Sequence, residues 1–460
     1  MLPPVEQVHF IGIGGYGMSA LAQVLLKMGY RVTGSDLKAS PITERLSRQG
    51  AKIYCGHRRE HVHGCGLAVY STAIPMDNPE IQEVLALGLP LWHRSELLAG
   101  LLNDHFGIAV AGTHGKTTTT AMISLLLEQA GMDPTAIIGG EVASFGGNAR
   151  LGQSRYLVAE ACESDHSFLR YRPALAIVTN LEPDHLEHYD GDFEKLRRAY
   201  FEFLGNLVPG GTAVLCVDDP RLREMAPRLK RKVVAYALEG PHENQADYVA
   251  RNIACAGYES TFELFYRDAF RCRVELKVPG KHNVSNAAGA LAVAAQLGVD
   301  LEQCVPALAA FQGAGRRFEI VARSGGITVV NDYAHHPTEI RVTIQAARSG
   351  GGRVCCLFQP HRYTRTAYFF EDFARSFHEA DLVLLHDIYP AGEKPIAGVS
   401  SEALARRIRE LSGREVYYSP DLEVLEERAL EFARPGDIIL VMGAGDVCQA
   451  AYNLRRRLQA

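Results

Sequence analysis

The sequence has little that would place it in a membrane or outside the cell. It contains no run of ~18 apolar residues, so no membrane-spanning helix is expected. Its first residues, Met-Leu-Pro-Pro-Val-Glu, lack the basic and apolar segments of a secretory signal peptide. The ten cysteines are scattered, and a chain of 460 residues needs no disulfides to fold. We therefore expect free thiols in the reducing cytoplasm.

The sequence also lacks a strong charge of one sign. Its 48 basic and 53 acidic residues give a net charge of -5. This balance favours solubility and gives no electrostatic reason to expect DNA or RNA as the main partner. Two short basic runs, 228–232 and 455–457, are interpreted as solvated faces.

What the chain does contain is an alternation of short apolar runs with longer helical stretches. This alternation is typical of βαβ units and parallel sheets. A strand followed by a glycine loop begins at Phe10 and again at Ile108, and a less regular third start lies at 326–332. At roughly 100–200 residues per domain, three starts in this length predict three α/β domains.

The first glycine loop, Gly12–Gly17, fits the pattern G-x-G-x-x-G between a strand and a helix, and Asp36 ends the next strand. Glycines let the backbone approach a pyrophosphate, and the start of a helix offers N–H groups to it. The loop predicts a diphosphate ligand. By itself it favours NAD, and the alternative is that the glycines serve only close packing of helix and strand.

The second glycine loop reads Gly-Thr-His-Gly-Lys-Thr from Gly112 to Thr117 and opens an apolar helix. It is a shortened P-loop, because Val110 stands where the longer pattern has glycine. Backbone N–H groups near Gly115 would cradle phosphates, Lys116 would add charge, and Thr117 would bind Mg²⁺. A dehydrogenase has no use for this loop, so ATP or GTP is predicted here and a second phosphorylated ligand at the first loop.

Acidic side chains follow two strands near this loop. They are Glu160, Glu163 and Asp165 after one strand, and Glu182, Asp184 and His185 after the next. Ligands gather at the carboxyl ends of parallel strands, and Mg²⁺ prefers oxygen ligands. The two clusters predict a magnesium site beside the P-loop, although each alone could be ordinary solvated charge.

Together with three further stretches, these motifs resemble the Mur ligase family in order and spacing. The further stretches are His282–Ala287, Arg316–Glu319 and Asn331–Glu339, and the likeness runs from Val8 to Asp446. The resemblance implies an α/β fold of three domains, each built on a mainly parallel sheet. They are a Rossmann-like UDP-sugar-binding domain at 1–106, a P-loop ATPase-like ATP-binding domain at 107–314, and a Rossmann-like amino-acid-binding domain at 315–460.

Within the family, the members that add L-alanine are the most similar, on Gly12–Ser19, Gly34–Leu37, Phe358–Thr366 and the pair His335 and His336. The resemblance implies an enzyme that consumes ATP, with Mg²⁺, to join L-alanine to the carboxylate of UDP-N-acetylmuramate through an acyl phosphate. It also implies a cytoplasmic place at the first peptide-adding step of peptidoglycan precursor synthesis, and hence in cell wall formation, cell shape and division.

The resemblance assigns roles to individual residues. For ATP they are Gly112, Thr113, His114, Gly115, Lys116, Thr117, Thr118, Asn283, Asn286, Arg317 and Asp332. For the UDP-sugar they are Gly12, Gly14, Gly15, Gly17, Ser35, Asp36, Ser71 and Thr72. For L-alanine they are His335, His336, His361, Arg362 and Arg365. Thr117, Glu160 and His185 are the implied metal ligands, and Lys116, Glu160, His185 and Arg317 are the implied catalytic residues.

The sequence departs from the family pattern at two positions. Tyr200 stands where several sibling ligases carry a carbamylated lysine, and Lys195 nearby is interpreted as a surface lysine. Cys162 stands where an aspartate is expected. A third feature, the segment Cys55–Cys65 with three histidines, does not fit the spacing of a zinc site and is interpreted as a solvated helix and loop.

Three other functions stay open. A sibling ligase that attaches a ready-made murein peptide during recycling would share almost every motif. An NAD-dependent dehydrogenase would explain the first loop alone. A non-catalytic nucleotide switch would not need Glu160, His185 and Arg317 together.

Overall fold

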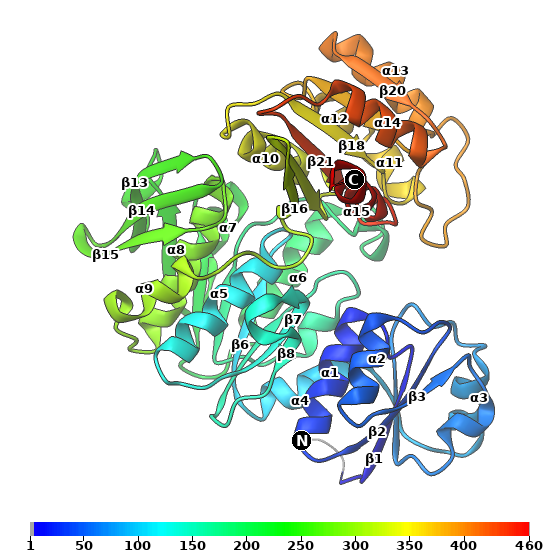
Figure 1. Ribbon diagram of the computed structural model, residues 1–460. Helices are drawn as coiled ribbons and strands as arrows, with labels where there is room; N and C mark the ends of the chain where they lie inside the picture. The colour runs from blue at the N-terminus through cyan, green and yellow to red at the C-terminus, as the bar shows by residue number, and fades with distance from the viewer. Residues whose placement is uncertain (1–3, 460) are drawn as a thin grey trace. The chain divides into compact units, whose positions relative to one another are not determined.

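The computed structural model describes residues 4–459, which form three β-sheets with helices beside each of them (Figure 1). Neighbouring strands within the sheets are mostly parallel, which confirms the predicted α/β fold. The chain divides into two compact units. The first unit comprises residues up to 252 with 262–274 and 284–311, and the second comprises 253–261, 275–283 and 312–460. The bounds given for the three domains stay predictions.

The first sheet has five parallel strands in the order β3-β2-β1-β4-β5. The strands are β1 (Gln7–Ile11), β2 (Arg31–Asp36), β3 (Lys52–Cys55), β4 (Leu67–Tyr70) and β5 (Leu91–His93), and the helices between them are α1 (Tyr16–Lys27), α2 (Pro41–Arg48), η1 (Arg59–Val62), α3 (Pro79–Ala86) and α4 (Arg94–Asn103). The strand order reverses between β1 and β4. In open α/β sheets, ligands bind at the carboxyl ends of the strands beside such a reversal, and the first glycine loop follows β1 there.

The second sheet has ten strands in the order β15-β14-β13-β12-β11-β10-β6-β9-β7-β8. In this order, the seven neighbouring strands β13-β12-β11-β10-β6-β9-β7 run parallel to one another, and the edge strand β8 is antiparallel to β7. The strands are β6 (Phe106–Ala111), β7 (Thr135–Val142), β8 (Gly147–Arg150), β9 (Tyr156–Glu160), β10 (Leu175–Val178), β11 (Thr212–Cys216), β12 (Lys232–Leu238), β13 (Tyr248–Ala256), β14 (Glu259–Tyr266) and β15 (Ala269–Leu276). The α-helices of this region are α5 (Lys116–Gln129), α6 (Phe193–Gly205), α7 (Pro220–Met225), α8 (Lys281–Gln296) and α9 (Leu301–Ala309).

The third sheet has six strands in the order β16-β17-β21-β18-β19-β20, of which only β16 is antiparallel to its neighbour. The strands are β16 (Glu319–Ser324), β17 (Ile327–Asp332), β18 (Val354–Phe358), β19 (Leu382–Leu385), β20 (Glu415–Tyr418) and β21 (Ile438–Met442). The helices are α10 (Pro337–Arg348), α11 (Tyr363–Tyr368), α12 (Phe370–Arg375), α13 (Ser401–Ser412), α14 (Leu422–Phe432) and α15 (Cys448–Gln459).

Strand β18 shows why these sheets need helices on both faces. All five of its side chains are 0% exposed. Cys356 and Phe358 join the hydrophobic core on one face, and Cys355 and Leu357 join the core on the other. A central parallel strand is therefore recognised in the sequence by a continuous run of apolar residues rather than by an alternation of apolar and polar residues.

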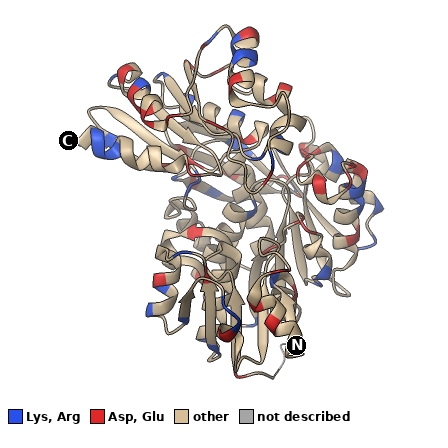
Figure 2. Ribbon diagram, turned by 90° about the vertical axis from the view of Figure 1, so that its right-hand side faces the viewer, with Lys and Arg blue, Asp and Glu red and all other residues tan. Residues whose placement is uncertain are grey.

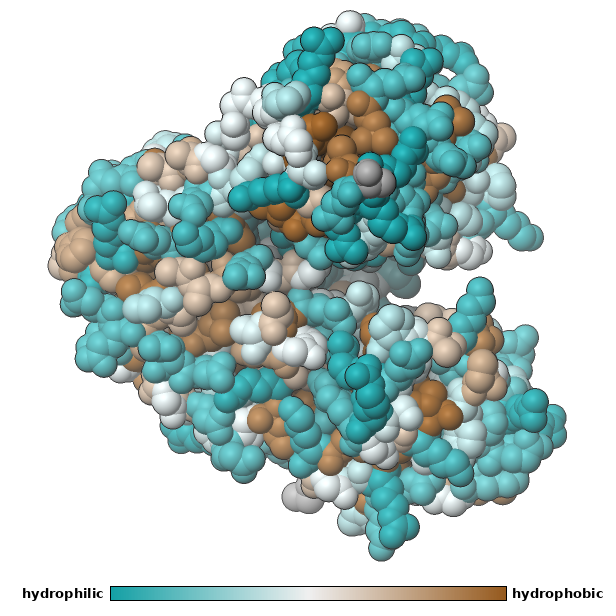
Figure 3. Space-filling model, in the orientation of Figure 1, coloured by the Kyte–Doolittle hydropathy of each residue, from teal (hydrophilic) through white to brown (hydrophobic). Residues whose placement is uncertain are grey.

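The surface agrees with the balanced composition. Basic and acidic segments are interspersed along the chain in Figure 2, and the face shown in Figure 3 is mostly hydrophilic with separate hydrophobic patches. Arg228, Lys230 and 455–457 are exposed, as predicted for the two basic runs. No helix among the described residues has the length and apolar character needed to cross a membrane.

One sequence interpretation is wrong. The histidine-rich segment is not a solvated helix and loop, because the side chains of His57 and His61 are only 10% and 12% exposed. Both rings bind the carboxylate of Glu80, which is 0% exposed. The pattern of residues 55–65 could not reveal this, since Glu80 lies on a different helix.

The loop before β18 gives a test of the packing. A β-carbon on Gly352 would lie 1.8 Å from the carbonyl oxygen of Gly436, and backbone atoms cannot move aside. We expect Gly352→Ala to lower the free energy of unfolding by about 1–3 kcal/mol or more, measured by thermal or urea unfolding. The control is Gly205→Ala at the end of α6, where nothing lies within 4 Å of the added carbon. Equal stability of the two variants would contradict the packing described.

Candidate active site

The first glycine loop is held by the end of β2. Gly12 N and Ile13 N both donate to the carbonyl of Ser35 at 2.9 Å, and Gly14 N donates to Asp36 Oδ2 at 2.8 Å. The φ of Gly12 is +81°, which favours glycine. Asp36, predicted to contact the ligand, thus also fixes the loop that would carry it.

Helix α1 starts directly after this loop, and no side chain caps its first turn. The N–H groups of that turn can therefore bind an anion, and the helix dipole favours negative charge there. Ser71 and Thr72 follow β4, the parallel neighbour of β1, so they lie at the same edge of the sheet as the loop. The hydroxyl of Ser35 is buried and donates to Glu80 Oε2 at 2.5 Å.

The second glycine loop joins β6 to α5 and passes very close to its neighbours. A β-carbon on Gly112 would lie 2.1 Å from Thr179 Oγ1, and one on Gly115 would lie 2.4 Å from Asn286 Oδ1. The φ values, +131° and +82°, favour glycine at both positions. Helix α5 also begins without a side-chain cap. The loop and the start of α5 thus form a second place for an anion, with Asn286 against it.

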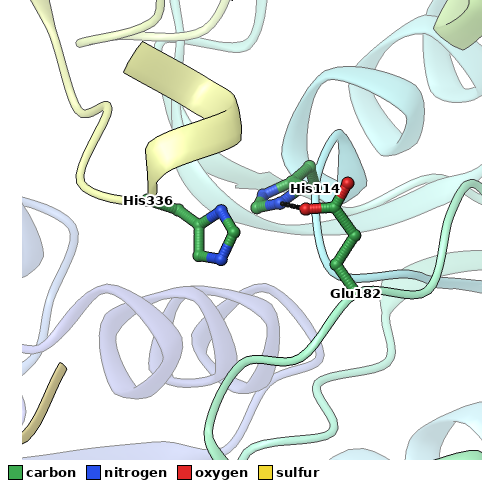
Figure 4. Close-up of side chains that lie close together, drawn as sticks. All are labelled: His114, Glu182 and His336. Atoms are coloured by element: carbon green, nitrogen blue, oxygen red, sulfur yellow. Dashed lines mark hydrogen bonds and ion pairs between the residues drawn. The ribbon is translucent and has the colours of Figure 1, made fainter. Parts of the chain in front are cut away.

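The residues after β10 brace this loop. His114 N donates to Asn180 Oδ1 at 2.8 Å, and Thr179 Oγ1 donates to the carbonyl of His114 at 2.6 Å. Figure 4 shows the ring of His114 beside the carboxylate of Glu182, with Nε2 3.3 Å from Oε2. Glu182 N also donates to Thr113 Oγ1 at 2.8 Å. Two of the predicted ATP-binding residues, Thr113 and His114, are therefore fixed from outside the loop.

The ammonium group of Lys116 lies between the loop and Glu163. Its Nζ donates to the two carboxylate oxygens of Glu163 at 3.0 and 3.1 Å and to the carbonyls of Gly112 and Thr113 at 2.5 and 3.1 Å. Burial alone would lower the pKa of Lys116, but the carboxylate of Glu163 outweighs it, and the pKa is raised. Lys116 therefore keeps its positive charge at the second glycine loop.

Two of the implied metal ligands lie against neighbouring glycines of β7. Glu160 Oε1 accepts a hydrogen bond from Gly139 N at 2.6 Å, and a β-carbon on Gly140 would lie 3.1 Å from Thr117 Cγ2. The structure thus brings the hydroxyl side chain and the carboxylate to one strand. His185 lies just before η4 (Leu186–His188), and its ring nitrogens are 3.7 and 3.6 Å from carboxylate oxygens of Asp184 and Glu187.

Of the two departures from the family pattern, Tyr200 is buried and Cys162 is half-buried. Burial, and then the nearby charge of Glu163, raises the pKa of the Cys162 thiol, which lies 3.1 Å from Ser164 Oγ. The thiol is therefore uncharged where an aspartate was expected. Tyr200 is 0% exposed on α6 and packs edge-on against Phe168.

In the second unit, Asp332 ends β17 and binds the backbone on both sides. Its oxygens accept hydrogen bonds from Phe318 N at 2.6 Å and Ala334 N at 2.7 Å. Burial raises the pKa of Asp332 to about 6, although Arg317 and these N–H groups oppose the rise. The predicted nucleotide contacts Arg317 and Asp332 are neighbours, because Asp332 binds the backbone of the residue after Arg317 and senses the Arg317 charge. Arg317 NH1 also lies 3.6 Å from Glu339 Oε1.

Three of the predicted alanine-binding side chains form a chain that starts at the same glutamate. His335 Nδ1 lies 3.2 Å from Glu339 Oε2, the His335 and His361 rings are 6.0 Å apart, and Arg365 NH1 lies 3.2 Å from His361 Nδ1. The ring of His361 also stacks on Tyr389 at 5.6 Å.

The other predicted residues of the second unit have local contacts. His336 caps α10, since its Nδ1 accepts a hydrogen bond from Thr338 N at 3.3 Å. Arg362 has a φ of +69° and lies 3.9 Å from Glu393. Asn283 Nδ2 donates to the carbonyl of Pro279 at 2.8 Å, one turn before Asn286 on α8. Their roles toward a ligand stay predictions.

Comparison with known proteins finds three family models, which match successive parts of the chain. The Mur ligase family, catalytic domain, matches residues 7–106, the Mur ligase middle domain matches 110–294, and the Mur ligase, glutamate ligase domain matches 316–445. The chain is 49% identical to UDP-N-acetylmuramate–L-alanine ligase of Pelotomaculum thermopropionicum, over 99% of this chain and 98% of that protein. It belongs to the Mur ligase family.

Other Mur ligases are similar along the whole chain. The enzyme of the same name from Sorangium cellulosum is 46% identical over 99% of this Mur ligase and 97% of that protein. UDP-N-acetylmuramate–alanine ligase of Thermotoga maritima superposes with a TM-score of 0.83 at 29% identity, covering 98% of this chain and 99% of that one. A murein peptide ligase of Psychrobacter arcticus gives 0.72 at 26% identity, covering 98% of both chains.

Several residues of this Mur ligase make contacts at the glycine loops that the sequence does not predict. The sequence indicates Glu163 only as one carboxylate of a predicted magnesium site, yet it binds Lys116 through both oxygens. Thr179, for which the sequence predicts no role, binds the loop backbone. Glu80 carried no signal at all. The position of Glu163 three residues beyond a strand end was the one clue that could have found its role.

The first test of the site is Lys116→Ala. Loss of one charged group placed at developing phosphate charge typically lowers the rate on the order of 10²–10³-fold, which ATP turnover would measure. The matched control is Lys195→Ala, since that ammonium is half exposed and binds the exposed Asp190 at 2.6 Å. Near-normal turnover of Lys116→Ala would refute the role given to the loop.

The second test concerns Asp332. Because its pKa in the folded protein, about 6, lies above the ordinary 3.8, the folded chain holds this proton more tightly than the unfolded chain does. The resulting stabilisation is fully present below about pH 3.8 and is lost as the pH rises through about 6. A ¹³C NMR titration of the carboxyl group should show a midpoint near 6 that is missing in Asp332→Asn. A midpoint below 4 would contradict the burial described.

Proposed function

We propose that this Mur ligase joins L-alanine to the carboxylate of UDP-N-acetylmuramate and consumes ATP. The observation that carries the proposal is the 49% identity, over nearly the full length of both chains, to a ligase named for this reaction. Two loops that suit anions, each leading into a helix without a side-chain cap, support it, because the reaction needs a UDP-sugar and ATP together.

The chemistry explains why ATP is needed. A carboxylate is a poor acyl donor, so its oxygen first attacks the γ-phosphate, giving an acyl phosphate and ADP. The uncharged amine of L-alanine then attacks the activated carbonyl, and the tetrahedral intermediate expels phosphate as the amide forms and the amine loses a proton. The first step gathers negative charge at the transferred phosphoryl group, which Lys116 and the start of α5 are placed to stabilise.

The metal-binding residues fit Mg²⁺. Thr117 and Glu160 offer the hydroxyl and carboxylate oxygens that Mg²⁺ prefers, and they lie against neighbouring glycines of β7. We propose that they hold the ion, with His185 as a further ligand. Bound there, Mg²⁺ would neutralise phosphate charge and help to align the γ-phosphate.

In the second unit we propose contacts to ATP and to the amino acid. Arg317 is proposed to contact the γ-phosphate and Asp332 the ribose. A guanidinium holds a carboxylate well through two parallel hydrogen bonds, so Arg365, beside His361, is proposed to bind the carboxylate of L-alanine. We further place the enzyme in the cytoplasm, at the first peptide-adding step of peptidoglycan synthesis.

Two alternatives are weaker. An NAD-dependent dehydrogenase would leave the second loop and Lys116 without a purpose. A ligase for ready-made murein peptides has support from the likeness to the Psychrobacter arcticus protein, although both the identity and the TM-score are lower than for the Thermotoga maritima ligase. The choice between alanine and peptide is the one to test.

The test is phosphate release from ATP and Mg²⁺ in the presence of UDP-N-acetylmuramate. Three reactions are compared, with no addition, with L-alanine, and with a stem tripeptide. We expect release only with L-alanine, and mass spectrometry should find a product with one alanine added. Lys116→Ala serves as the control for contaminating activity. Release only with the tripeptide would move the enzyme to peptide recycling, and release with neither would refute the proposed function.

A further inference from the structure

The histidine-rich segment closes around a single buried carboxylate. Glu80, in the first turn of α3, is 0% exposed. Its Oε2 lies 3.1 Å from His57 Nδ1, its Oε1 lies 2.7 Å from His61 Nδ1, and His9 Nε2 from β1 lies 3.6 Å from Oε2. Arg58 N also donates to Oε1 at 3.3 Å. Three segments far apart in the sequence thus meet at one side chain.

This cluster is organised around a negative charge rather than a metal ion. Burial alone would raise the pKa of Glu80, but the interactions with His9, Ser35 and His61 lower it to about 2. Among residues 4–459, the ligand atoms of these histidines and Glu80 do not include three within 4.8 Å of one another. Glu80 is therefore a carboxylate at neutral pH, held by several donors at once.

A single residue connects this carboxylate to the first glycine loop. The Ser35 hydroxyl donates to Glu80 Oε2 at 2.5 Å, and the carbonyl of the same residue accepts the hydrogen bonds of Gly12 N and Ile13 N at 2.9 Å. The next residue, Asp36, accepts the hydrogen bond of Gly14 N. Ser35 is 0% exposed, and its hydroxyl also lies 3.0 Å from His57 Nδ1, so the cluster around Glu80 surrounds this side chain.

We infer that Glu80 is a positioning residue for the UDP-sugar: by holding Ser35 it sets the path of the glycine loop and thereby the direction of the N–H groups that bind the diphosphate. The inference rests on the proposed function, which supplies the ligand. It assigns to the histidine-rich segment the task of keeping Glu80 ionised and in place.

The experiment measures binding of UDP-N-acetylmuramate by calorimetry without ATP or L-alanine. Glu80→Gln keeps the shape of the side chain and removes its charge. We expect the Kd to rise roughly tenfold or more, as for loss of a buried charged hydrogen bond. The control is Glu83→Gln on the same helix, where the carboxylate also binds a histidine at 3.0 Å, but this histidine, His63, is half exposed. Its Kd should be unchanged.

Kinetics separate positioning from a general loss of structure. We expect the KM for UDP-N-acetylmuramate to rise in Glu80→Gln while kcat and the KM for ATP change by less than about twofold. A side chain that only supports folding would instead lower the unfolding temperature and kcat together and leave the Kd of the folded fraction unchanged. That result would overturn the inference. Failure of the wild-type protein to bind the UDP-sugar would refute the proposed function instead.

A double-mutant cycle tests the path through Ser35. If Glu80 acts through that hydroxyl, Ser35→Ala and the double variant Ser35→Ala/Glu80→Gln should have Kd values within about twofold of each other. If the two substitutions instead raise the Kd independently, so that their fold-changes multiply in the double variant, the inference is overturned. If Glu80→Gln does not fold, His61→Asn removes the 2.7 Å contact together with the stacking of the ring on Tyr54, and should still raise the Kd about threefold. An unchanged Kd in that variant would also overturn it.

Discussion

The structure depends on keeping the first N–H groups of two helices open to negative charge. Helices α1 and α5 both begin without a side-chain cap, directly after a glycine loop. At Gly112 and Gly115 the neighbouring side chains approach so closely that no β-carbon fits. Parallel sheets satisfy this constraint, because every strand ends at the same edge and the next loop can brace the one before it. The hydrogen bonds that the end of β2 and the residues after β10 make to the two glycine loops follow from this arrangement.

Each glycine loop is linked by hydrogen bonds to a buried carboxylate. Glu163 is 1% exposed and reaches its loop through Lys116, while Glu80 is 0% exposed and reaches its loop through Ser35. An isolated buried charge would be very costly, so each carboxylate is bonded to several donors. A buried carboxylate with several hydrogen-bond donors has few alternative conformations, so it holds the loop beside it in one position. A loop that is to bind phosphate through its backbone N–H groups needs such a fixed position.

The sequence predicts the fold and the two glycine loops, but it does not predict the contacts between segments that are far apart in the chain. The two loops and the parallel sheets follow from local patterns, namely glycine spacing and continuous apolar runs such as Val354–Phe358. The cluster at Glu80 follows from no local pattern, because β1, η1 and α3 supply its members and only the folded sheet brings them together. His336 shows the converse, since a position given to the ligand by resemblance also caps α10.

L-alanine and a peptide differ in the position of the substrate carboxylate relative to the attacking amine. In L-alanine the carboxylate is attached to the carbon that bears the attacking amine, whereas in a peptide the same position is a neutral amide. A methyl group is worth only ~1–3 kcal/mol of discrimination, which cannot separate alanine sharply from glycine or serine. A guanidinium such as that of Arg365, buried beside His361, would discriminate by charge instead, because it forms two parallel hydrogen bonds with a carboxylate but not with a neutral amide. With Arg365 as the proposed ligand of the amino-acid carboxylate, we expect peptides to be rejected more strongly than other small amino acids.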